Sequence, residues 1–301
     1  MRVVIALGGN AILRRGEEPT AAAQRRNVER AVRAVARVAR EHQVVITHGN
    51  GPQVGVLALQ RGKDGGAAFP LDVLGAQTEG MIGYLLSQGL QNELPERQVA
   101  TILTQVEVDP DDPAFDRPTK PIGAVMPEDE ARRLAEARGW ELAPERLGWR
   151  RVVPSPEPRR ILEVDTVRLL VDHGVLVVCA GGGGIPVIFD SWGRVFGVEA
   201  VIDKDRTAAL LARDIDAEAL LLLTDVDGVY RDWGTKGERL LERLDLDRWE
   251  NLGLPEGSMR PKVVACADFV RQTGGFAAIG ALEDAERILA GSAGTRVYSA
   301  A

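Results

Sequence analysis

Short apolar runs alternate with longer amphipathic segments along the whole chain. Several of the short runs are apolar on both faces, which is typical of strands in a parallel sheet that is covered on both sides. In the segment 20–41, arginines and glutamates share one helical face while alanines and valines share the other. Strands are expected at 2–7, 44–47, 99–104, 174–180, 219–224, 276–280 and 295–299, and helices at 20–41, 72–92, 163–173, 203–213 and 283–290. The alternation predicts an α/β fold with helices on both faces of the sheet.

The segment 109–160 interrupts this alternation. It contains nine of the chain's 16 prolines and one short helical pattern near 127–138. Such proline density favours extended and turned backbone over the strands of a core. We interpret the segment as an insertion that projects from the sheet and acts as a lid. The alternative is a long surface excursion without a function, which is less common for long ordered loops.

Composition limits the classes of partner. The chain has 301 residues, enough for one large domain or two lobes, and a formal net charge of −7. The negative charge argues against a nucleic-acid partner, because binding to phosphates needs a basic face. No apolar stretch approaches the ~20 residues of a membrane span. The only two cysteines, Cys179 and Cys266, suit neither a disulfide framework nor a zinc site, which fits a reducing, cytoplasmic setting.

Lysine is rare in this chain. Only five of the 37 basic residues are lysines. A lysine ammonium is a compact point charge that the planar guanidinium of arginine does not simply replace, so each lysine is a candidate for a specific role. Lys120, Lys204 and Lys262 lie in motifs, whereas Lys63 and Lys236 lie in polar, glycine-containing stretches and are expected to be solvated.

Four glycine-containing loops follow apolar runs or precede a helix. They read LGGNAI (7–12), THGNGPQVG (47–55), AGGGGIPV (180–187) and GSMRPKV (257–263). Glycine lets backbone N–H groups approach an anion, and ligands of open α/β sheets bind beyond the carboxyl ends of the strands. Tight turns also need glycine, but four such loops in one chain favour a phosphate site over plain turns.

Two familiar nucleotide motifs are absent from the sequence. No GxGxxG follows the first strand, and no GxxxxGK[ST] occurs, so neither a dinucleotide-binding site nor a P-loop is indicated. His48, within THGNG, is a candidate base, but the adjacent Gly-Asn-Gly indicates a site made by backbone. We therefore favour a structural His48.

The stretch AVIDKDRTAALLA (200–212) places Lys204 between Asp203 and Asp205 at the start of a helical pattern. One interpretation is a solvated charge cluster in which an aspartate caps the helix. The other is a lysine directed at a phosphate and held by a neighbouring carboxylate. The stretch alone favours the first interpretation, and the other lysine and glycine motifs favour the second.

The ordered set of motifs resembles the carbamate kinases of the amino acid kinase superfamily. The set comprises LGGNAI, THGNGPQVG, QTEGMIGY, DPAFDRPTKPIG, RRVVPSPEP, AGGGGIPV, VEAVIDKD, LLTDVDGVY, GSMRPKV and AGTRV, and spans nearly the whole chain. The resemblance implies a three-layer αβα sandwich on a mostly parallel sheet of about eight strands. It implies one domain over 1–301 with a small protruding lid subdomain at 118–158. It further implies a homodimer and the reversible reaction of ATP and carbamate to ADP and carbamoyl phosphate with Mg²⁺.

The resemblance also implies a role for each motif. The amino-terminal half binds the carbamoyl end, and the carboxyl-terminal half binds the nucleotide. Lys204 contacts the transferred phosphoryl group, Asp205 orients Lys204, Lys262 reaches the nucleotide phosphates and Lys120 adds a third cation from the lid. Substrate and phosphoryl contacts come from Gly8, Gly9, Asn10, Gly49, Asn50, Gly51, Gly182 and Gly183, and nucleotide contacts from Asp225, Asp227, Tyr230 and Lys262. Asp203 is expected to be a cap or local structural partner, and the metal-ligating residues are left unassigned.

Three residues depart from the pattern of the family. Glu79 lies where an amide or small polar residue is expected, Arg206 where an apolar residue is common, and Arg260 where a glycine often precedes Pro-Lys. Two other functions stay open: a kinase of another small acid or phosphate, and a non-catalytic nucleotide-binding regulator on the same fold. The joint presence of Lys120, Lys204 and Lys262 in a lysine-poor chain argues against the regulator.

Overall fold

The computed structural model describes residues 1–13, 17–18, 20–50, 54, 57, 69–145, 147–247, 249–254 and 259–299. Its centre is an eight-stranded sheet in the order β15-β17-β16-β12-β1-β2-β9-β3. The strands are β1 (Arg2–Leu7), β2 (Gln43–His48), β3 (Val99–Thr101), β9 (Leu176–Val178), β12 (Ala219–Thr224), β15 (Arg243–Asp245), β16 (Phe276–Ala281) and β17 (Thr295–Tyr298). All neighbouring pairs are parallel except β16 with β17. The predicted, mostly parallel sheet is therefore confirmed.

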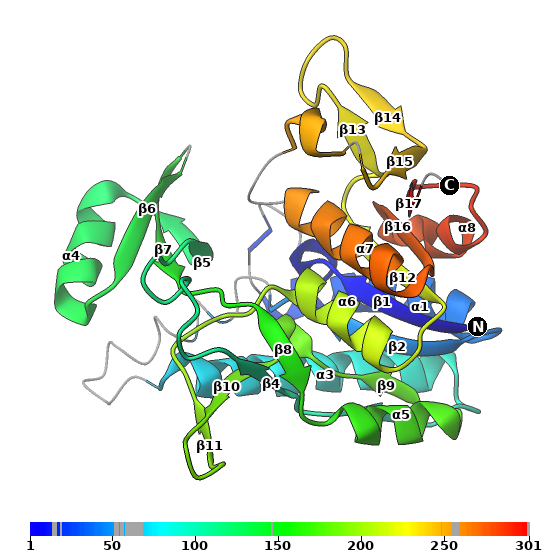
Figure 1. Cartoon of the computed structure of the whole chain (residues 1–301), viewed down its shortest axis with the longest axis horizontal. Coiled ribbons are helices and arrows are strands. Elements are labelled where there is room, and N and C mark those ends of the chain that lie inside the picture. Colours follow the sequence, from blue (N-terminus) through cyan, green and yellow to red (C-terminus); the bar gives the residue numbers. More distant parts are fainter. Residues whose placement is uncertain are drawn as a thin grey trace.

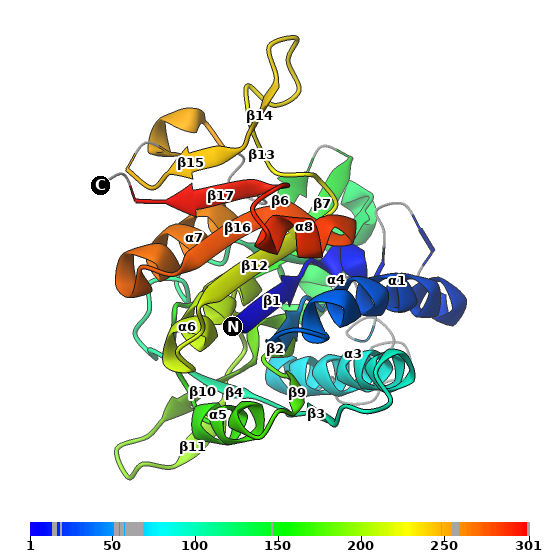
Figure 2. The ribbon, with the colours of Figure 1, turned by 90° about the vertical axis from the view of Figure 1, so that its right-hand side faces the viewer.

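Helices cover both faces of this sheet, as Figure 2 shows. One face carries α1 (Ala21–Ala39), α3 (Leu71–Glu93) and α8 (Ala285–Leu289), and the other carries α5 (Val164–Asp172), α6 (Lys204–Asp214) and α7 (Met259–Thr273). Within β1, the side chains of Val3, Ile5 and Leu7 belong to the core under α1, α3 and α8. Those of Val4 and Ala6 belong to the core under α5, α6 and α7. Because successive side chains of a strand point to opposite faces, a strand covered on both sides is apolar throughout.

A second sheet of four strands, in the order β11-β10-β4-β8, flanks the first. It contains β4 (Gln105–Val108), β8 (Pro158–Ile161), β10 (Ile185–Phe189) and β11 (Val195–Gly197). The single strand expected at 99–104 is wrong in its second half, because β3 ends at Thr101. The hydroxyl of Thr104 accepts from the amide of Ala180 at 2.8 Å, and the amide of Ile185 donates to Thr104 O at 2.8 Å. These bonds direct the chain away from the central sheet.

The proline-rich insertion forms a small subdomain that projects to the left in Figure 1. It contains β5 (Lys120–Met126), α4 (Glu128–Arg138), β6 (Glu141–Glu145) and β7 (Gly148–Val153), with β7 in the middle of an antiparallel sheet. Pro121 and Pro144 lie on the edge strands, whereas β7 has none. A proline cannot donate to a ladder, so edge strands tolerate it. We call residues 120–153 the lid; the boundaries 118–158 and its closing motion stay predictions.

The remaining elements complete the carboxyl-terminal half. A hairpin of β13 (Val229–Arg231) and β14 (Arg239–Leu241) stands above β15 in Figure 1. Short 3₁₀ turns cover Gly9–Ala11, Gly181–Gly183, Trp249–Leu252 and Leu282–Asp284. Among the described residues, no helix is long and apolar enough to cross a lipid bilayer.

Candidate active site

Three strands of the central sheet end at the same level. The register pairs Leu7 of β1 with His48 of β2 and with Leu223 of β12. The loops that follow these strands therefore emerge side by side at the carboxyl edge of the sheet. A cavity of about 320 Å³ opens there. Its wall contains loop residues after β1, β2 and β12, the first turns of α6 and α7, and the start of β5 from the lid.

Glycines bring the loop backbones together around this cavity. Gly8, Gly9, Gly49 and Gly182 line it. A side chain on Gly49 would lie 3.3 Å from Cδ of Lys204, and a side chain on Gly182, which has φ +69°, would overlap the amide of Asn50. Asn50 therefore excludes a Cβ at Gly182, whereas a Cβ at Gly49 would make tight contacts that its neighbours would have to relieve by small shifts.

Not every predicted backbone donor is available. The amide of Gly8 donates to Leu223 O at 2.9 Å, and the amide of Gly49 donates to Leu7 O at 3.0 Å. Because these two N–H groups already have carbonyl partners, Gly8 and Gly49 supply close backbone approach rather than donors to an anion. Gly183 does not line the cavity; its carbonyl accepts from the hydroxyl of Thr207 at 2.8 Å. Gly51 lies outside the described residues.

Two lysines share one buried carboxylate. Nζ of Lys204 donates to Oδ1 of Asp205, and Nζ of Lys262 donates to Oδ2 of the same residue at 2.8 Å. Asp205 is only 3% exposed. Asp205, which was expected to orient Lys204, thus contacts both lysines, although they lie 58 positions apart in the sequence.

The three charges adjust one another's pKa values. Burial, the largest influence, lowers the pKa of Lys204 to about 8, and repulsion by the Lys262 ammonium acts in the same direction. Burial also disfavours the charged form of Lys262, but the Asp205 carboxylate outweighs it and raises the pKa of Lys262. For Asp205, burial is outweighed by Lys204 and Lys262, which lower its pKa. The Asp205 carboxylate therefore favours the charged form of both lysines, against the effect of burial.

The helix start places Lys204 in the cavity wall. Asp203 is the N-cap of α6, and its Oδ1 accepts from the amides of Asp205 at 2.9 Å and Arg206 at 3.4 Å. This agrees with the expectation that Asp203 caps the helix. Lys204 is the first residue of α6, so its position is fixed by a capped, rigid turn.

The lid contributes the third lysine. Nζ of Lys120 donates to Oδ2 of Asp203 at 2.6 Å, and Lys120, Pro121 and Ile122 all line the cavity. The sequence contains no local signal for this contact, because Lys120 and Asp203 are 83 positions apart.

A buried polar layer supports the glycine loop after β9. Oε1 of Glu79 accepts from the amide of Gly181 at 2.9 Å, and Oε2 accepts from the amide of Thr104 at 3.3 Å. Burial raises the pKa of Glu79 to about 8. His48 is fully buried, which lowers its pKa to about 4, and its Nδ1 lies 3.2 Å from Gly49 O. Neither side chain lines the cavity, which favours the structural interpretation of His48.

The candidate nucleotide contacts separate into two groups. Asp225 and Lys262 line the cavity. Asp227 lines a different cavity of about 630 Å³, beside Arg243 and Arg287. The hydroxyl of Tyr230 donates to Oδ1 of Asp227 at 2.6 Å, which is the first cause of a Tyr230 pKa raised to about 12. The structure thus brings only Asp225 and Lys262 next to Lys204.

The model of the amino acid kinase family matches residues 1–279. This chain belongs to the amino acid kinase family. A carbamate kinase from Rhizobium meliloti (strain 1021) is 52% identical over 307 residues, which cover 99% of this chain and 94% of that protein. The family assignment and the resemblance inferred from the motifs are confirmed.

Solved structures of a family member have the same fold. The carbamate kinase from Giardia lamblia bound to citric acid is 40% identical, with a TM-score of 0.92, and 99% of this chain and 98% of that chain are covered. The same protein bound to AMP-PNP gives a TM-score of 0.90 at 40% identity and the same coverage. The three-layer αβα architecture is therefore that of the family.

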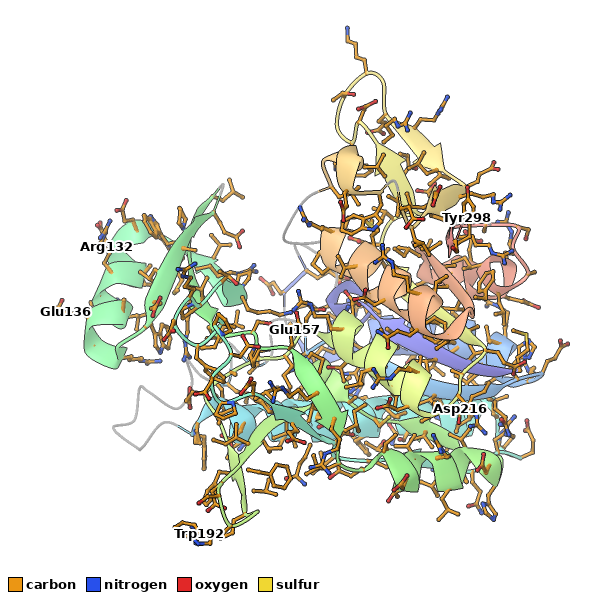
Figure 3. All side chains as sticks on the ribbon, viewed as in Figure 1. Arg132, Glu136, Glu157, Trp192, Asp216 and Tyr298 are labelled. Atoms are coloured by element: carbon orange, nitrogen blue, oxygen red, sulfur yellow. The ribbon has the colours of Figure 1, made fainter. Side chains whose placement is uncertain are left out.

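Two departures from the family pattern lie outside the cavity. Arg206 donates to Glu157, which Figure 3 labels between the lid and α6. The guanidinium of Arg260 lies 5.7 Å from the ring centre of Trp249. Neither arginine lines the cavity, so neither adds a charge to its wall.

Proposed function

We propose that this chain is a carbamate kinase, which transfers the γ-phosphoryl group of ATP reversibly to carbamate and so forms ADP and carbamoyl phosphate. The observation that carries the proposal is the convergence of Lys204, Lys262 and the lid's Lys120 on one cavity, beside glycine loops. The identity to carbamate kinases over nearly the whole chain supports the same substrate. A cavity of about 320 Å³ also suits a small acceptor such as carbamate.

Phosphoryl transfer needs positioning and charge neutralisation more than covalent chemistry. In our proposal, Lys204 contacts the transferred phosphoryl group, Lys262 contacts the nucleotide phosphates and Lys120 stabilises the charge from the lid side. Asp205 holds the first two ammonium groups in place, so little reorganisation is needed as charge moves between the acceptor and ADP. Fixed donors of this kind are worth about 10²–10³ in rate for each one removed.

The acceptor is proposed to bind on the amino-terminal side of the cavity. Gly9, Asn10, Asn50 and Gly182 contribute backbone contacts there, with Gly8 and Gly49 allowing the close approach. On the carboxyl-terminal side, Asp225 and Lys262 contact the nucleotide phosphates. Asp227 and Tyr230 are retained only as more distant nucleotide contacts, because they lie beside another cavity.

Mg²⁺ is proposed to enter with the nucleotide. Among the described residues, no cluster of three His, Cys, Asp or Glu side chains is arranged to hold a metal. Asp225 in the cavity wall supplies one carboxylate, and Mg²⁺ is commonly held by one or two carboxylates together with substrate phosphates. The residues present therefore fit an ion that neutralises phosphate charge during transfer.

A homodimer in the cytoplasm is also part of the proposal. Tyr84 on α3 and Leu103 after the edge strand β3 are 56% and 51% exposed, so two large apolar side chains are exposed near one edge of the central sheet. Exposed apolar side chains of this kind are typical of contacts with another protein, here proposed to be a second copy of the chain. The buried, unpaired state of Cys179 and Cys266 is compatible with a reducing compartment.

The direct test mixes the purified protein with ADP, Mg²⁺ and fresh carbamoyl phosphate and measures ATP. We expect rapid ATP formation that falls at least about 100-fold in Lys204→Ala. The exposed Lys236 provides the matched control, and Lys236→Ala should retain the wild-type rate. Absence of ATP from a folded protein that binds ADP would exclude carbamate kinase.

A further inference from the structure

The two aspartates beside Lys204 hold different partners. Asp205 binds Lys204 and Lys262 within the main body of the protein. Asp203 uses Oδ1 to cap α6 and Oδ2 to accept from Lys120 of the lid at 2.6 Å. One carboxylate therefore connects the lid to the first turn of the helix that carries Lys204.

Other contacts hold the lid against the main body. Ile122 and Val153 of the lid pack against Leu71 and Leu74 of α3. The amide of Val201 donates to Pro154 O at 2.9 Å. These contacts anchor the base of the lid, but they do not fix the conformation of the long, rotamer-rich side chain of Lys120.

A second ion pair between the lid and the main body is weaker and lies elsewhere. Arg151 approaches Glu199 at 3.9 Å, and the Glu199 side chain is 57% exposed. Among the described residues, Lys120 and Asp203 form the only lid-to-body ion pair in which both partners line the cavity. Their side chains are 26% and 18% exposed, so solvent screens them less.

We propose that Asp203 is a positioning residue that docks Lys120 at the cavity wall before the substrate arrives. The inference rests on the proposed function, because Lys120 is taken as a cation for the phosphoryl group. An ammonium group has three N–H donors, so the bond to Asp203 leaves two for a phosphoryl oxygen. A lysine already held beside the cavity loses less freedom when substrate binds, which improves affinity.

Asp203→Asn separates docking from helix capping. Asparagine caps helices about as well as aspartate, so the start of α6 is preserved while the charge opposite Lys120 is removed. Once carbamoyl phosphate is bound, its own charge attracts Lys120. We therefore expect KM for carbamoyl phosphate to rise about tenfold, kcat to change less than about threefold, and KM for ADP to stay constant.

Three further variants complete the kinetic test. Glu199→Gln removes the negative charge of the peripheral pair, and the side-chain oxygen of the glutamine can still accept from the backbone amide of Leu71. This variant should leave kcat and both KM values unchanged. Lys120→Ala should lower kcat as well, and Asp203→Asn should have no further effect in that background. An unchanged or lower KM in Asp203→Asn, or an effect that adds fully to Lys120→Ala, overturns the proposal.

Hydrogen exchange of the free protein provides a readout that needs no activity. Asp203→Asn should speed amide exchange in residues 120–126, whereas Glu199→Gln should not. Equal exchange in wild type and Asp203→Asn overturns the docking role. If the wild type makes no ATP from carbamoyl phosphate, the proposed function fails, and the exchange rates still decide whether Asp203 docks the lid.

Discussion

Glu79 is a carboxyl group in the middle of a core, and we predict that it makes the stability of the fold depend on pH. It is 1% exposed on α3, where its oxygens accept from the amides of Gly181 and Thr104. Burial raises its pKa from the ordinary 4.5 to about 8, because the charged form loses hydration. The folded protein therefore retains this proton more tightly than the unfolded chain.

The direction of the effect follows from proton linkage. For a carboxyl with a raised pKa, the stabilisation is fully present below the ordinary pKa and is lost as the pH rises through about 8. Each tenfold change in affinity for the proton corresponds to about 1.4 kcal/mol, so complete ionisation removes about 5 kcal/mol from the free energy of unfolding.

Glu79→Gln removes the titration and introduces a smaller, constant cost. Its amide has one acceptor oxygen for Gly181 or Thr104, and the NH₂ group faces the other donor, which costs about 1–2 kcal/mol. The variant should therefore be less stable than wild type at pH 5 and more stable by about 3 kcal/mol at pH 9. The two stability curves should cross at about pH 6.

Urea unfolding at pH 5, 7 and 9 and constant ionic strength measures this difference. His48 and Lys204 also have shifted pKa values, but both proteins contain them, so their titrations cancel in the comparison. Glu96→Gln on the exposed surface is the control and should follow wild type at each pH. A free-energy difference between wild type and Glu79→Gln that is constant from pH 5 to 9 would refute the reasoning.

Two other predictions concern the cavity. Because Lys204 has a pKa lowered to about 8, it loses its charge as the pH rises above that value, and kcat/KM for carbamoyl phosphate should decline there. A pH profile of Lys204→Arg, which stays charged, should lack this decline even if its rate is low. Gly182→Ala should raise KM for carbamoyl phosphate about tenfold or more, because its Cβ would displace Asn50. Gly193 has a similar φ of +76° but open space around it, so Gly193→Ala should cost about 1 kcal/mol of stability without changing KM. Equal KM values for the two alanine variants would contradict this reasoning.

The sheet was predictable because its strands are apolar on both faces. Each of the expected strands at 2–7, 219–224 and 276–280 matches its observed strand within one residue. Short strands with less burial were missed: β4 and β11 have polar or exposed positions, so their hydrophobic pattern is weak. They form a sheet only because distant segments pair, and a local pattern does not contain that information.

The part of the candidate site that was predictable from the sequence is the part made by a rare residue type, lysine. Lysine scarcity singled out Lys120, Lys204 and Lys262, and all three line one cavity. Pairing within that site was not predictable, because the partner of Lys120 comes from a helix cap 83 residues away. The buried hydrogen bonds of Glu79 were missed for a similar reason. The sequence shows only that the residue type is unusual, whereas the amides that donate to its carboxyl group belong to two other loops.

The charges of the cavity explain why aspartates surround Lys204. Lys120, Lys204 and Lys262 line it together with Asp203, Asp205 and Asp225, so the formal charges in the wall balance. Burying three unpaired ammonium groups would cost far more than the fold's stability allows. The paired groups are held in position without a ligand. In the proposed function, this balance keeps ground-state binding of the phosphoryl group weak, so the fixed cations act mainly on the group as it is transferred, in either direction.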